Sequence, residues 1–482
     1  MRYNNYINGE WTAPSTGEYG VNTSPHDTND IIGEFPLSGT SDVIEAVAAA
    51  KTAFASWKKL SYAQRGAYLK KAADYLKANV EQIGRDLTRE EGKTLAEGKG
   101  EVLRAASIFD YYAAESLQPV GDVIPSANAD TFLYTTRVPL GPIGLITPWN
   151  FPIAIPVWKM APALIYGNTV VIKPADQTPM CVNYVMEALH QAGIPAGVIN
   201  CVYGRGSVVG EEIVTNPDIK AISFTGSNGV GLNIQEKAIA KGKKVQLEMG
   251  GKNPLVILAD ADINKAVELT IGGAFRSTGQ KCTATSRVIV EAGIYEQFRD
   301  ALVERTKSLK VGNPLEADVF MGPCASKAQQ ATVLSMIEAG KAEADLLCGG
   351  EVPADASLAN GFYVQPTVFE NVGRDARIAR EEIFGPVVAL FKVENYEEAV
   401  ELANDTPFGL SCSICTNNLT LARRFVADME TGMVHVNSET AGAEPQVPFG
   451  GCKDSSTGSR EQGKTAIDFY TQVKTVYMDG MY

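Results

Sequence analysis

The spacing of apolar positions divides the chain into a helical N-terminal part and a longer part in which strands and helices alternate. Over residues 41–115, apolar residues recur at intervals of three and four, as in "AYLKKAADYLKANVEQIGRDL", and this spacing predicts amphipathic helices. Over residues 142–224, short apolar runs such as "NTVVIKPA" and "KAISFTGS" each lead through a turn into a helical stretch. This alternation predicts a mostly parallel sheet with helices on both faces.

A second series of strands and helices runs from "NPLVILADAD" to "GPVVALFKVENYEEAVELAND" and predicts a second α/β domain that begins near residues 250–251. Two further segments, residues 131–138 and 469–478, alternate apolar and polar positions as strands do. Such segments either form arms that extend the sheet of a second subunit or serve as edge strands of their own chain. The pattern favours neither over the other.

Composition and charge narrow the class of protein. A chain of 482 residues, with 45% hydrophobic and 21% charged residues, predicts a soluble protein of two or three domains. Its net charge of −13 argues against general binding to nucleic acid or anionic membranes, because both require a positive field. The N-terminus lacks a secretory signal and the most apolar run is too short to span a bilayer, so we expect a cytoplasmic location. We expect the eight cysteines to be reduced, and the three scattered histidines predict no metal site.

Three residues are candidates for catalysis. Cys282 lies among small polar residues in "RSTGQKCTATSR" and is either a nucleophile or one more thiol. The adjacent Lys281 could lower the thiol pKa or could face away from the sulfur. Asn150, in the proline-bounded loop "TPWNFP", could donate to an oxyanion or could bond its own turn. Glu248, in "QLEMGG", could activate a water molecule or could be a helix-cap or surface acid.

Further polar residues follow predicted strands, where open α/β sheets bind ligands. Gly226 in "SFTGSNGVG" predicts a turn and a helix start whose N–H groups could bind a phosphate. Lys173 and Asp176 in "VVIKPADQTP" suit a ribose with vicinal hydroxyls, or could form a solvated ion pair. Glu382 and Phe384 in "REEIFGPV" could equally be a polar turn and a core aromatic residue.

In chain order, the motifs "PWNFP", "GNTVVIKPA", "FTGSNGVG", "LEMGGKNP", "GQKCTATSR", "EEIFGPV", "NDTPFGLS" and "PFGGCK" resemble the NAD(P)-dependent aldehyde dehydrogenase superfamily over nearly the full length of the chain. The resemblance implies an α/β fold with a Rossmann-like parallel-sheet cofactor domain (residues 1–119 and 141–250) and an α/β catalytic domain (251–440). It also implies a β oligomerisation arm (120–140 and 460–482). A homodimer or homotetramer is therefore expected, and the two alternating segments become candidate arms.

The same resemblance assigns roles to individual residues. Cys282 would be the nucleophile, Glu248 the general base, and Asn150 the oxyanion donor together with the Cys282 backbone N–H. This chemistry needs no metal and no histidine. The residues implied for binding NAD or NADP are Thr147, Pro148, Trp149, Lys159, Lys173, Asp176, Gly226, Ser227, Gly250, Glu382 and Phe384.

Two departures from the common family pattern bear on cofactor and substrate. NAD-preferring relatives commonly carry glutamate where this chain has Asp176, so we expect a slight preference for NAD with use of both cofactors. The tail "KDSSTGSRE" is one residue longer than the usual form and, with "GQKCT", resembles α-ketoglutaric semialdehyde (2,5-dioxopentanoate) dehydrogenases. Succinate semialdehyde dehydrogenases are the first alternative. A CoA-acylating semialdehyde dehydrogenase and an inactive binding protein on this fold are further alternatives, and Glu248 argues against the former.

Both semialdehydes end in a carboxylate, which predicts a basic anchor in the pocket. Arg104, in "EVLRAASIFDYYAAE", is the candidate because this helix lines the mouth of the substrate tunnel in the family, and an arginine can bind a carboxylate through two hydrogen bonds. The alternative is a surface arginine paired with Glu101. The other expected substrate contacts are Phe151, Trp158, Lys281 and Phe449, of which the aromatic residues could equally be ordinary core.

Overall fold

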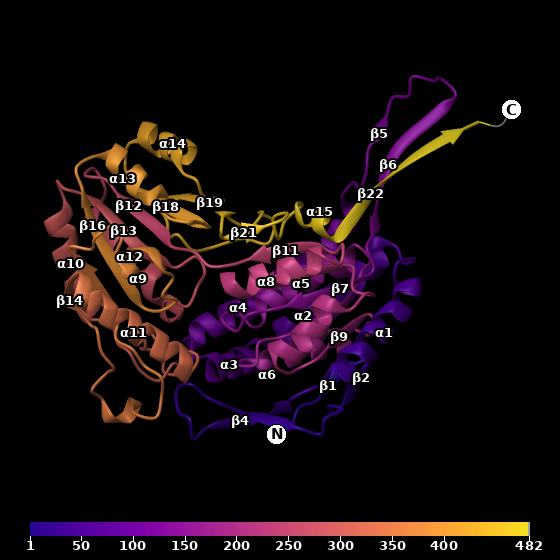
Figure 1. Ribbon diagram of the computed structural model, residues 1–482, viewed down its shortest axis with the longest axis horizontal. Coiled ribbons are helices and arrows are strands. Elements are labelled where there is room, and N and C mark those ends of the chain that lie inside the picture. Colours follow the sequence, from indigo (N-terminus) through magenta and orange to yellow (C-terminus); the bar gives the residue numbers. More distant parts are fainter. Residues whose placement is uncertain (481–482) are drawn as a thin grey trace.

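The computed structural model describes residues 1–480, which form two α/β bodies and a β arm that projects away from them (Figure 1). The first body is built on an eight-stranded sheet. Its strand order is β2 (Glu10–Thr12), β1 (Asn5–Ile7), β9 (Ile199–Cys201), β8 (Thr169–Lys173), β7 (Pro142–Ile146), β10 (Ala221–Thr225), β11 (Lys244–Glu248) and β21 (Ser456–Thr457). The five strands from β9 to β11 run parallel, while β1, β2 and β21 are antiparallel to their neighbours. The predicted mostly parallel sheet is confirmed.

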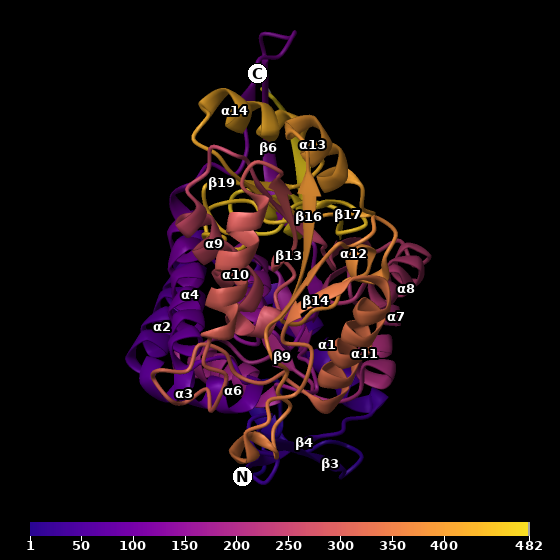
Figure 2. The same ribbon diagram turned by 90° about the vertical axis from the view of Figure 1, so that its left-hand side faces the viewer.

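Helices cover both faces of this sheet because its strands are apolar on both sides. On β8, Val170 and Ile172 pack into one core while Val171 packs into the other. One face carries α2 (Tyr62–Ala78), α3 (Val80–Glu91), α4 (Leu95–Ala114), α5 (Ala154–Ile165) and α6 (Pro179–Gln191). The other carries α1 (Thr40–Trp57), α7 (Glu211–Thr215) and α8 (Asn228–Ile239). Figure 2 shows α2 and α4 on the opposite side of the molecule from α7 and α8.

The second body is built on a seven-stranded sheet, in which only β14 runs antiparallel to its neighbour. Its order is β14 (Asp345–Cys348), β15 (Thr367–Glu370), β16 (Val387–Val393), β13 (Thr285–Glu291), β12 (Asn253–Ile257), β18 (Ser411–Cys415) and β19 (Met433–Val436). One face carries α9 (Ile263–Phe275) and α10 (Tyr295–Lys307). The other carries α11 (Lys327–Glu343), α12 (Arg377–Arg380), α13 (Tyr396–Asn404) and α14 (Leu419–Asp428).

The arm is a three-stranded antiparallel sheet of β22 (Thr471–Asp479), β6 (Thr131–Pro139) and β5 (Val123–Ile124). The two alternating segments of the sequence therefore pair with each other, in a register that sets Thr471 opposite Pro139. The second strand begins two residues later than its alternation predicts, because Phe469 and Tyr470 are buried at the end of α15 (Ala466–Tyr470). In Figure 1 the arm stands clear of both sheets.

Shorter elements complete the fold. They are the hairpin of β3 (Tyr19–Thr23) and β4 (Ile31–Pro36), the pair β17 (Phe408–Gly409) and β20 (Cys452–Lys453), and the short helices η1 (Glu115–Leu117), η2 (Gly206–Gly210), η3 (Arg276–Gly279) and η4 (Ala356–Leu358). None of the helices within residues 1–480 is both long and apolar enough to cross a membrane.

The cysteines are all free, including two with the C-x-x-C spacing of a redox pair. Cys412 and Cys415 both lie on β18, where side chains three residues apart point to opposite faces of the sheet. Cys412 accordingly packs into the core beside α11–α14, and Cys415 into the core beside α9 and α10. The strand geometry keeps these two thiols on opposite sides of the sheet.

Candidate active site

A cleft of about 250 Å³ lies where the two bodies meet. The first body lines it with Pro148, Trp149, Asn150, Ile155, Thr225, Gly226, Ser227, Met249 and Gly250. The second body lines it with Cys282, Gln329, Thr332, Glu382, Ile383 and Phe384. Motifs that are far apart in the sequence therefore share one cavity, and many of the predicted site residues are among them.

The backbone that leads to Cys282 adopts an unusual conformation. Ser277, Thr278 and Gly279 have φ values of 54°, 56° and 66°, so three consecutive residues are left-handed. A left-handed residue other than glycine costs on the order of 1 kcal/mol and persists only where its surroundings hold it. At Gly279 a side chain is also excluded by space, because a Cβ would lie 2.3 Å from the Gly385 carbonyl oxygen. The surrounding contacts thus fix the turn that presents the thiol.

Burial, together with the nearby carboxylates of Glu382 and Glu248, raises the pKa of the Cys282 thiol to about 12. The backbone N–H groups of Cys282 and Thr283 act in the opposite direction. Lys281 does not contribute, since its buried ammonium group donates to the Gly272 carbonyl of α9 at 3.1 Å. The side chain of Lys281 is directed to α9, so of the orientations that the sequence leaves open the structure has the one that faces away from the sulfur.

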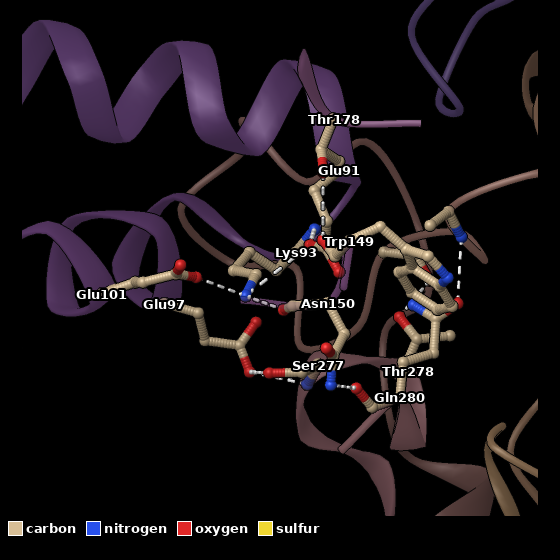
Figure 3. A network of polar contacts seen from close by, with 12 residues as sticks. Glu91, Lys93, Glu97, Glu101, Trp149, Asn150, Thr178, Ser277, Thr278 and Gln280 are labelled. Carbon is tan, nitrogen blue, oxygen red and sulfur yellow. Dashed lines mark hydrogen bonds and ion pairs between the residues drawn. The ribbon is translucent and has the colours of Figure 1, made fainter. Parts of the chain in front are cut away.

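Asn150 is buried in the loop after β7 and is held at both ends. Its side-chain amide donates to the Gln280 carbonyl at 3.0 Å, and its own carbonyl accepts from Lys93 Nζ at 2.7 Å (Figure 3). The amide group has two N–H donors, and the bond to Gln280 uses one of them. The second can donate to an oxyanion formed next to Cys282.

Glu248 ends β11 and is buried, but its carboxyl group does not line the cleft as Met249 and Gly250 do. Ser456 Oγ donates to Glu248 Oε2 at 2.6 Å. Burial and the neighbouring Glu461 raise the pKa of Glu248 well above its ordinary value. A carboxylate with a raised pKa is a stronger base once it is ionised, which suits the activation of water.

Lys159, which was predicted to contact the cofactor, does not line the cleft and lies beside the carboxyl groups of Glu248 and Glu461. Its fully buried ammonium group forms an ion pair with Glu461 and donates to Ser223 Oγ at 2.8 Å. Ser456 and Glu461 are not among the site residues predicted from the sequence, although both lie in the unusual tail "KDSSTGSRE". Their position could not be inferred locally, because β21 reaches β11 from a point 208 residues further along the chain.

Of the residues predicted to bind the cofactor, Ser227, Gly250, Glu382 and Phe384 line the cleft, whereas Lys173, Asp176 and Thr147 do not. Ser227 precedes the first turn of α8 at the cleft, where the free N–H groups of a helix favour an anion. Gly250 leaves space for Glu382, since a Cβ there would lie 2.4 Å from Glu382 Oε2. The Gly251 N–H donates to Glu382 Oε1 at 2.9 Å, and burial raises the pKa of Glu382 to about 7. Phe384, with a φ of 55°, packs edge-on against Trp149 at 5.4 Å.

Lys173, Asp176 and Thr147 lie outside the cleft lining. Lys173 Nζ donates to Asp176 Oδ1 at 2.8 Å and to the Pro174 carbonyl at 2.8 Å, so these two predicted ribose contacts bond each other. The Asp176 side chain is half exposed and faces a separate hollow of about 170 Å³ beside β3 and β4. The buried hydroxyl groups of Thr147 and Thr225 have no hydrogen-bond partner among the described residues. Unpartnered buried donors next to a cleft suit a polar ligand.

Arg104, on α4, has no hydrogen bond or ion pair within the described part of the chain. Its partly buried guanidinium lies over the Trp158 ring, 5.9 Å from the ring centre, and close enough to Cys282 to interact with it electrostatically. The alternative partner, Glu101, is buried and occupied, because it pairs with Lys93 at 2.7 Å and accepts from the backbone N–H groups of Ile153 and Ala154. The surface ion pair between Arg104 and Glu101 does not form.

The aromatic residues expected around the substrate lie close to one another. Trp158 and Phe449 have ring centres 5.2 Å apart, and Phe151 lies under Lys93 Nζ at 4.1 Å. All three pack in the same apolar cluster, against which the Cys282 side chain also rests. The expected aromatic residues and the thiol therefore border the same apolar cluster, over which the Arg104 guanidinium lies at Trp158.

The comparisons with known proteins agree with this geometry. A sequence model of the aldehyde dehydrogenase family matches residues 11–476. Among curated relatives, an alpha-ketoglutaric semialdehyde dehydrogenase of Bacillus subtilis is 53% identical over 99% of this chain and 98% of its own length. A 2,5-dioxopentanoate dehydrogenase of Saccharolobus solfataricus is 41% identical, over 97% of this chain and 98% of its own.

Solved structures give the same result for the fold. The NAD+ complex of an aldehyde dehydrogenase from Bacillus cereus has a TM-score of 0.96 at 35% identity, covering 99% of this chain and 97% of that one. An E. coli NADP-dependent enzyme has a TM-score of 0.95 at 35% identity, covering 99% and 98%. Because both matches cover 99% of this chain, the likeness extends over both bodies and the arm.

Proposed function

Because the chain belongs to the aldehyde dehydrogenase family, we propose that it oxidises 2,5-dioxopentanoate, a short semialdehyde with a carboxylate at its far end, to 2-oxoglutarate. It is an NAD(P)-dependent aldehyde dehydrogenase, which acts on the aldehyde group with NAD or NADP as the acceptor. One observation carries the choice of substrate. Within residues 1–480, Arg104 is a cation without a carboxylate partner, and it lies beside Trp158 and near Cys282.

The residues around the cleft fit a nicotinamide cofactor. The N-terminus of α8 at Ser227 would hold the pyrophosphate, and Glu382, in the space left by Gly250, would bond the hydroxyls of the nicotinamide ribose. When bound, the cofactor supplies a hydride acceptor. Phe384 and Trp149, which pack edge-on in the same cleft as Cys282, would contact the ring. Lys173 and Asp176 would contact the adenosine ribose, for which the half-exposed Asp176 offers a free carboxylate oxygen.

The roles of the catalytic residues follow from their surroundings. Cys282, as the thiolate, adds to the aldehyde carbon and forms a tetrahedral oxyanion, to which the free N–H of Asn150 and the Cys282 backbone N–H donate. Loss of hydride from that carbon leaves a thioester on Cys282. Glu248 then removes a proton from a water molecule that attacks the thioester, and the acid leaves as the thiolate is regenerated. Ser456 holds the Glu248 carboxyl group in place.

A slight preference for NAD is part of the proposal. Asp176 would place a carboxylate near the 2′ position of the adenosine ribose, where it would repel the 2′-phosphate of NADP. Aspartate is one methylene shorter than glutamate, so both cofactors should be accepted. Solved relatives described as an NAD+ complex and as an NADP-dependent enzyme both share this fold.

We also propose that the arm pairs between copies of the chain in a dimer or tetramer. Val473 and Tyr477 of β22 are exposed on one face of it, and Met478 of β22 and Phe132 of β6 are exposed on the other. Packing against another copy of the chain would bury one of these apolar faces. Light scattering on the wild type and on Tyr477→Glu would test this, with a smaller assembly expected for the variant. A cytoplasmic location stays part of the proposal.

The proposed substrate can be tested on the wild-type enzyme. We expect kcat/KM to be highest for 2,5-dioxopentanoate, lower for succinate semialdehyde and lowest for pentanal, with NAD and NADP each measured. A clear preference for pentanal would contradict the proposal. Product analysis with and without CoA distinguishes the acylating alternative, which the buried, hydrogen-bonded Glu248 disfavours. Absence of NADH formation with every aldehyde would indicate an inactive binding protein.

A further inference from the structure

Charged side chains that the proposed mechanism does not use lie directly behind the reacting centre. Lys93, in the turn between α3 and α4, and Glu97 and Glu101, in the first turns of α4, belong to one polar network with Asn150 and Ser277 (Figure 3). Lys93 and Glu101 are almost fully buried, at 1% and 3% exposure. Buried charges of this kind are retained only where they are paired and hydrogen-bonded.

Lys93 and Glu101 fix the loop that carries the oxyanion donor. Lys93 Nζ bonds Glu101 Oε2 at 2.7 Å and the Asn150 carbonyl at 2.7 Å. The other oxygen of Glu101 accepts from the backbone N–H groups of Ile153 and Ala154, where α5 begins, at 2.9 and 3.0 Å. Burial alone would lower the pKa of Lys93, but the charges of Glu101 and Glu91 raise it above its ordinary value, so the ammonium group stays charged. The loop is thus tied to α4 on both sides of Phe151.

Glu97 fixes the turn that carries the nucleophile. Its Oε2 accepts from the N–H and hydroxyl of Thr94 at 2.9 and 2.8 Å, which caps α4. Its Oε1 accepts from the Ser277 N–H at 2.7 Å, across the boundary between the two bodies. Ser277 is the first of the three left-handed residues before Cys282, so this carboxylate holds a strained conformation that the local sequence disfavours.

The loop held by Lys93 and Glu101 and the turn held by Glu97 are joined by the hydrogen bond from the Asn150 amide to the Gln280 carbonyl. Asn150 belongs to the first body, while Gln280 lies two residues before Cys282 in the second. The distance from the amide donor to the thiol is therefore set by three links: Lys93 to Asn150, Glu97 to Ser277, and Asn150 to Gln280. A displacement of about 1 Å at such a donor can lower a rate by roughly 100-fold.

We propose that three side chains at the start of α4 are positioning residues for the reaction. Lys93 and Glu101 position the oxyanion donor Asn150, and Glu97 positions the turn that carries the nucleophile Cys282. Together they set the distance between the donor and the thiol. This inference rests on the proposed roles of Asn150 and Cys282. None of the three touches the substrate, and each acts through another residue.

A double-mutant cycle in kcat/KM tests the Lys93 half. Lys93→Met should lower kcat for aldehyde oxidation by roughly 10- to 100-fold and change KM by less than about threefold, because it removes a bond to the loop and not to the substrate. In an Asn150→Ala background the same change should have an effect of less than about twofold. Losses that multiply would overturn the proposal, since Lys93 would then act independently of Asn150. Asn150→Ala alone tests the proposed oxyanion role, so the two failures are distinguishable.

Alkylation of Cys282 by iodoacetamide, followed by peptide mass spectrometry, separates positioning from general damage, because this reaction forms no oxyanion. Lys93→Met should leave the alkylation rate within about threefold, whereas Glu97→Gln, which loosens the thiol's own turn, should lower alkylation and oxidation together by roughly fivefold or more. Equal losses of alkylation in Lys93→Met would contradict the assignment.

Should Lys93→Met unfold at the assay temperature, the charge-balanced Lys93→Met/Glu101→Gln takes its place in the same cycle. Lys99 lies on α4, as Glu97 and Glu101 do, and forms an ion pair at the surface with Glu81 of α3. Lys99→Met removes this pair, is the matched control and should retain activity.

Discussion

The two ends of the proposed substrate site differ in how their polar groups are bonded. At the end where the chemistry would occur, Asn150 is held on both sides and Glu248 accepts from Ser456. At the far end, Arg104 has no hydrogen bond or ion pair among residues 1–480 and lies over an aromatic ring. The groups proposed to act through their geometry are thus held in place by the protein, while the group proposed to recognise the substrate is left free to bond a carboxylate.

The largest effect is expected at the nucleophile. Cys282→Ala should lower kcat by roughly 10⁴-fold or more, because no other thiol reaches the cleft to form the thioester. Steady-state NADH formation measures this loss. Cys452→Ala is the matched control, since Cys452 is the other partly exposed cysteine, and it should retain activity within about threefold. A Cys282→Ala enzyme with substantial turnover would refute the covalent mechanism.

The next largest effect is expected at the base. Glu248→Gln should lower steady-state kcat by roughly 100- to 1,000-fold, because thioester hydrolysis loses its base while thiol addition and hydride loss are retained. Rapid-mixing measurements should therefore still show a burst of NADH close to one equivalent per site. Loss of the burst along with turnover would place Glu248 in an earlier step.

The pH dependence of thiol reactivity tests whether burial and nearby carboxylates raise the pKa of Cys282. Burial and the carboxylates of Glu382 and Glu248 raise the pKa of Cys282 to about 12 in the absence of cofactor. The thiolate fraction then increases about tenfold per pH unit throughout the range below that value, so the alkylation rate should keep rising from pH 7 to 10. Glu382→Gln should raise the rate at each pH, because one negative neighbour is removed. A plateau near pH 8.5 would indicate an unperturbed thiol.

The smallest effect is expected at the adenosine ribose. Asp176→Glu extends a half-exposed carboxylate by one methylene and should raise the ratio of kcat/KM for NAD over NADP by roughly three- to tenfold. Both cofactors should be measured with the same aldehyde at saturation. An unchanged ratio would remove Asp176 from the discrimination between the cofactors.

Motifs in the sequence predicted both sheets and most of the cleft lining because they sit directly at strand ends, where local pattern and ligand position coincide. Side-chain direction was not predictable in the same way. Lys159 and Lys281 were predicted to contact the cofactor and the substrate, yet their ammonium groups bond Glu461 and the Gly272 carbonyl. Adjacent side chains on one segment face different surroundings, and only tertiary packing decides which.

Long-range contacts account for what the sequence did not reveal. Glu101 and Lys93 belong to a segment with polar residues throughout, in which nothing in the local pattern distinguishes a buried charge from a solvated one. The start of α5 and the Asn150 carbonyl bury both side chains. Ser456 reaches Glu248 only because the tail folds back onto β11. Phe469 and Tyr470 satisfied strand alternation but are needed in the core beneath the arm.

The measurement that tests the central claim most directly is the selectivity of Arg104→Met. A charge-assisted bond to a carboxylate contributes about 1.5–3 kcal/mol, so the ratio of kcat/KM for 2,5-dioxopentanoate over pentanal should fall by roughly 10- to 100-fold, with pentanal oxidation nearly unchanged. Restoration of much of the ratio in Arg104→Lys would support a role for the charge. If the ratio is the same in Arg104→Met as in the wild type, Arg104 does not bind the carboxylate, and the proposed basis of substrate choice is wrong.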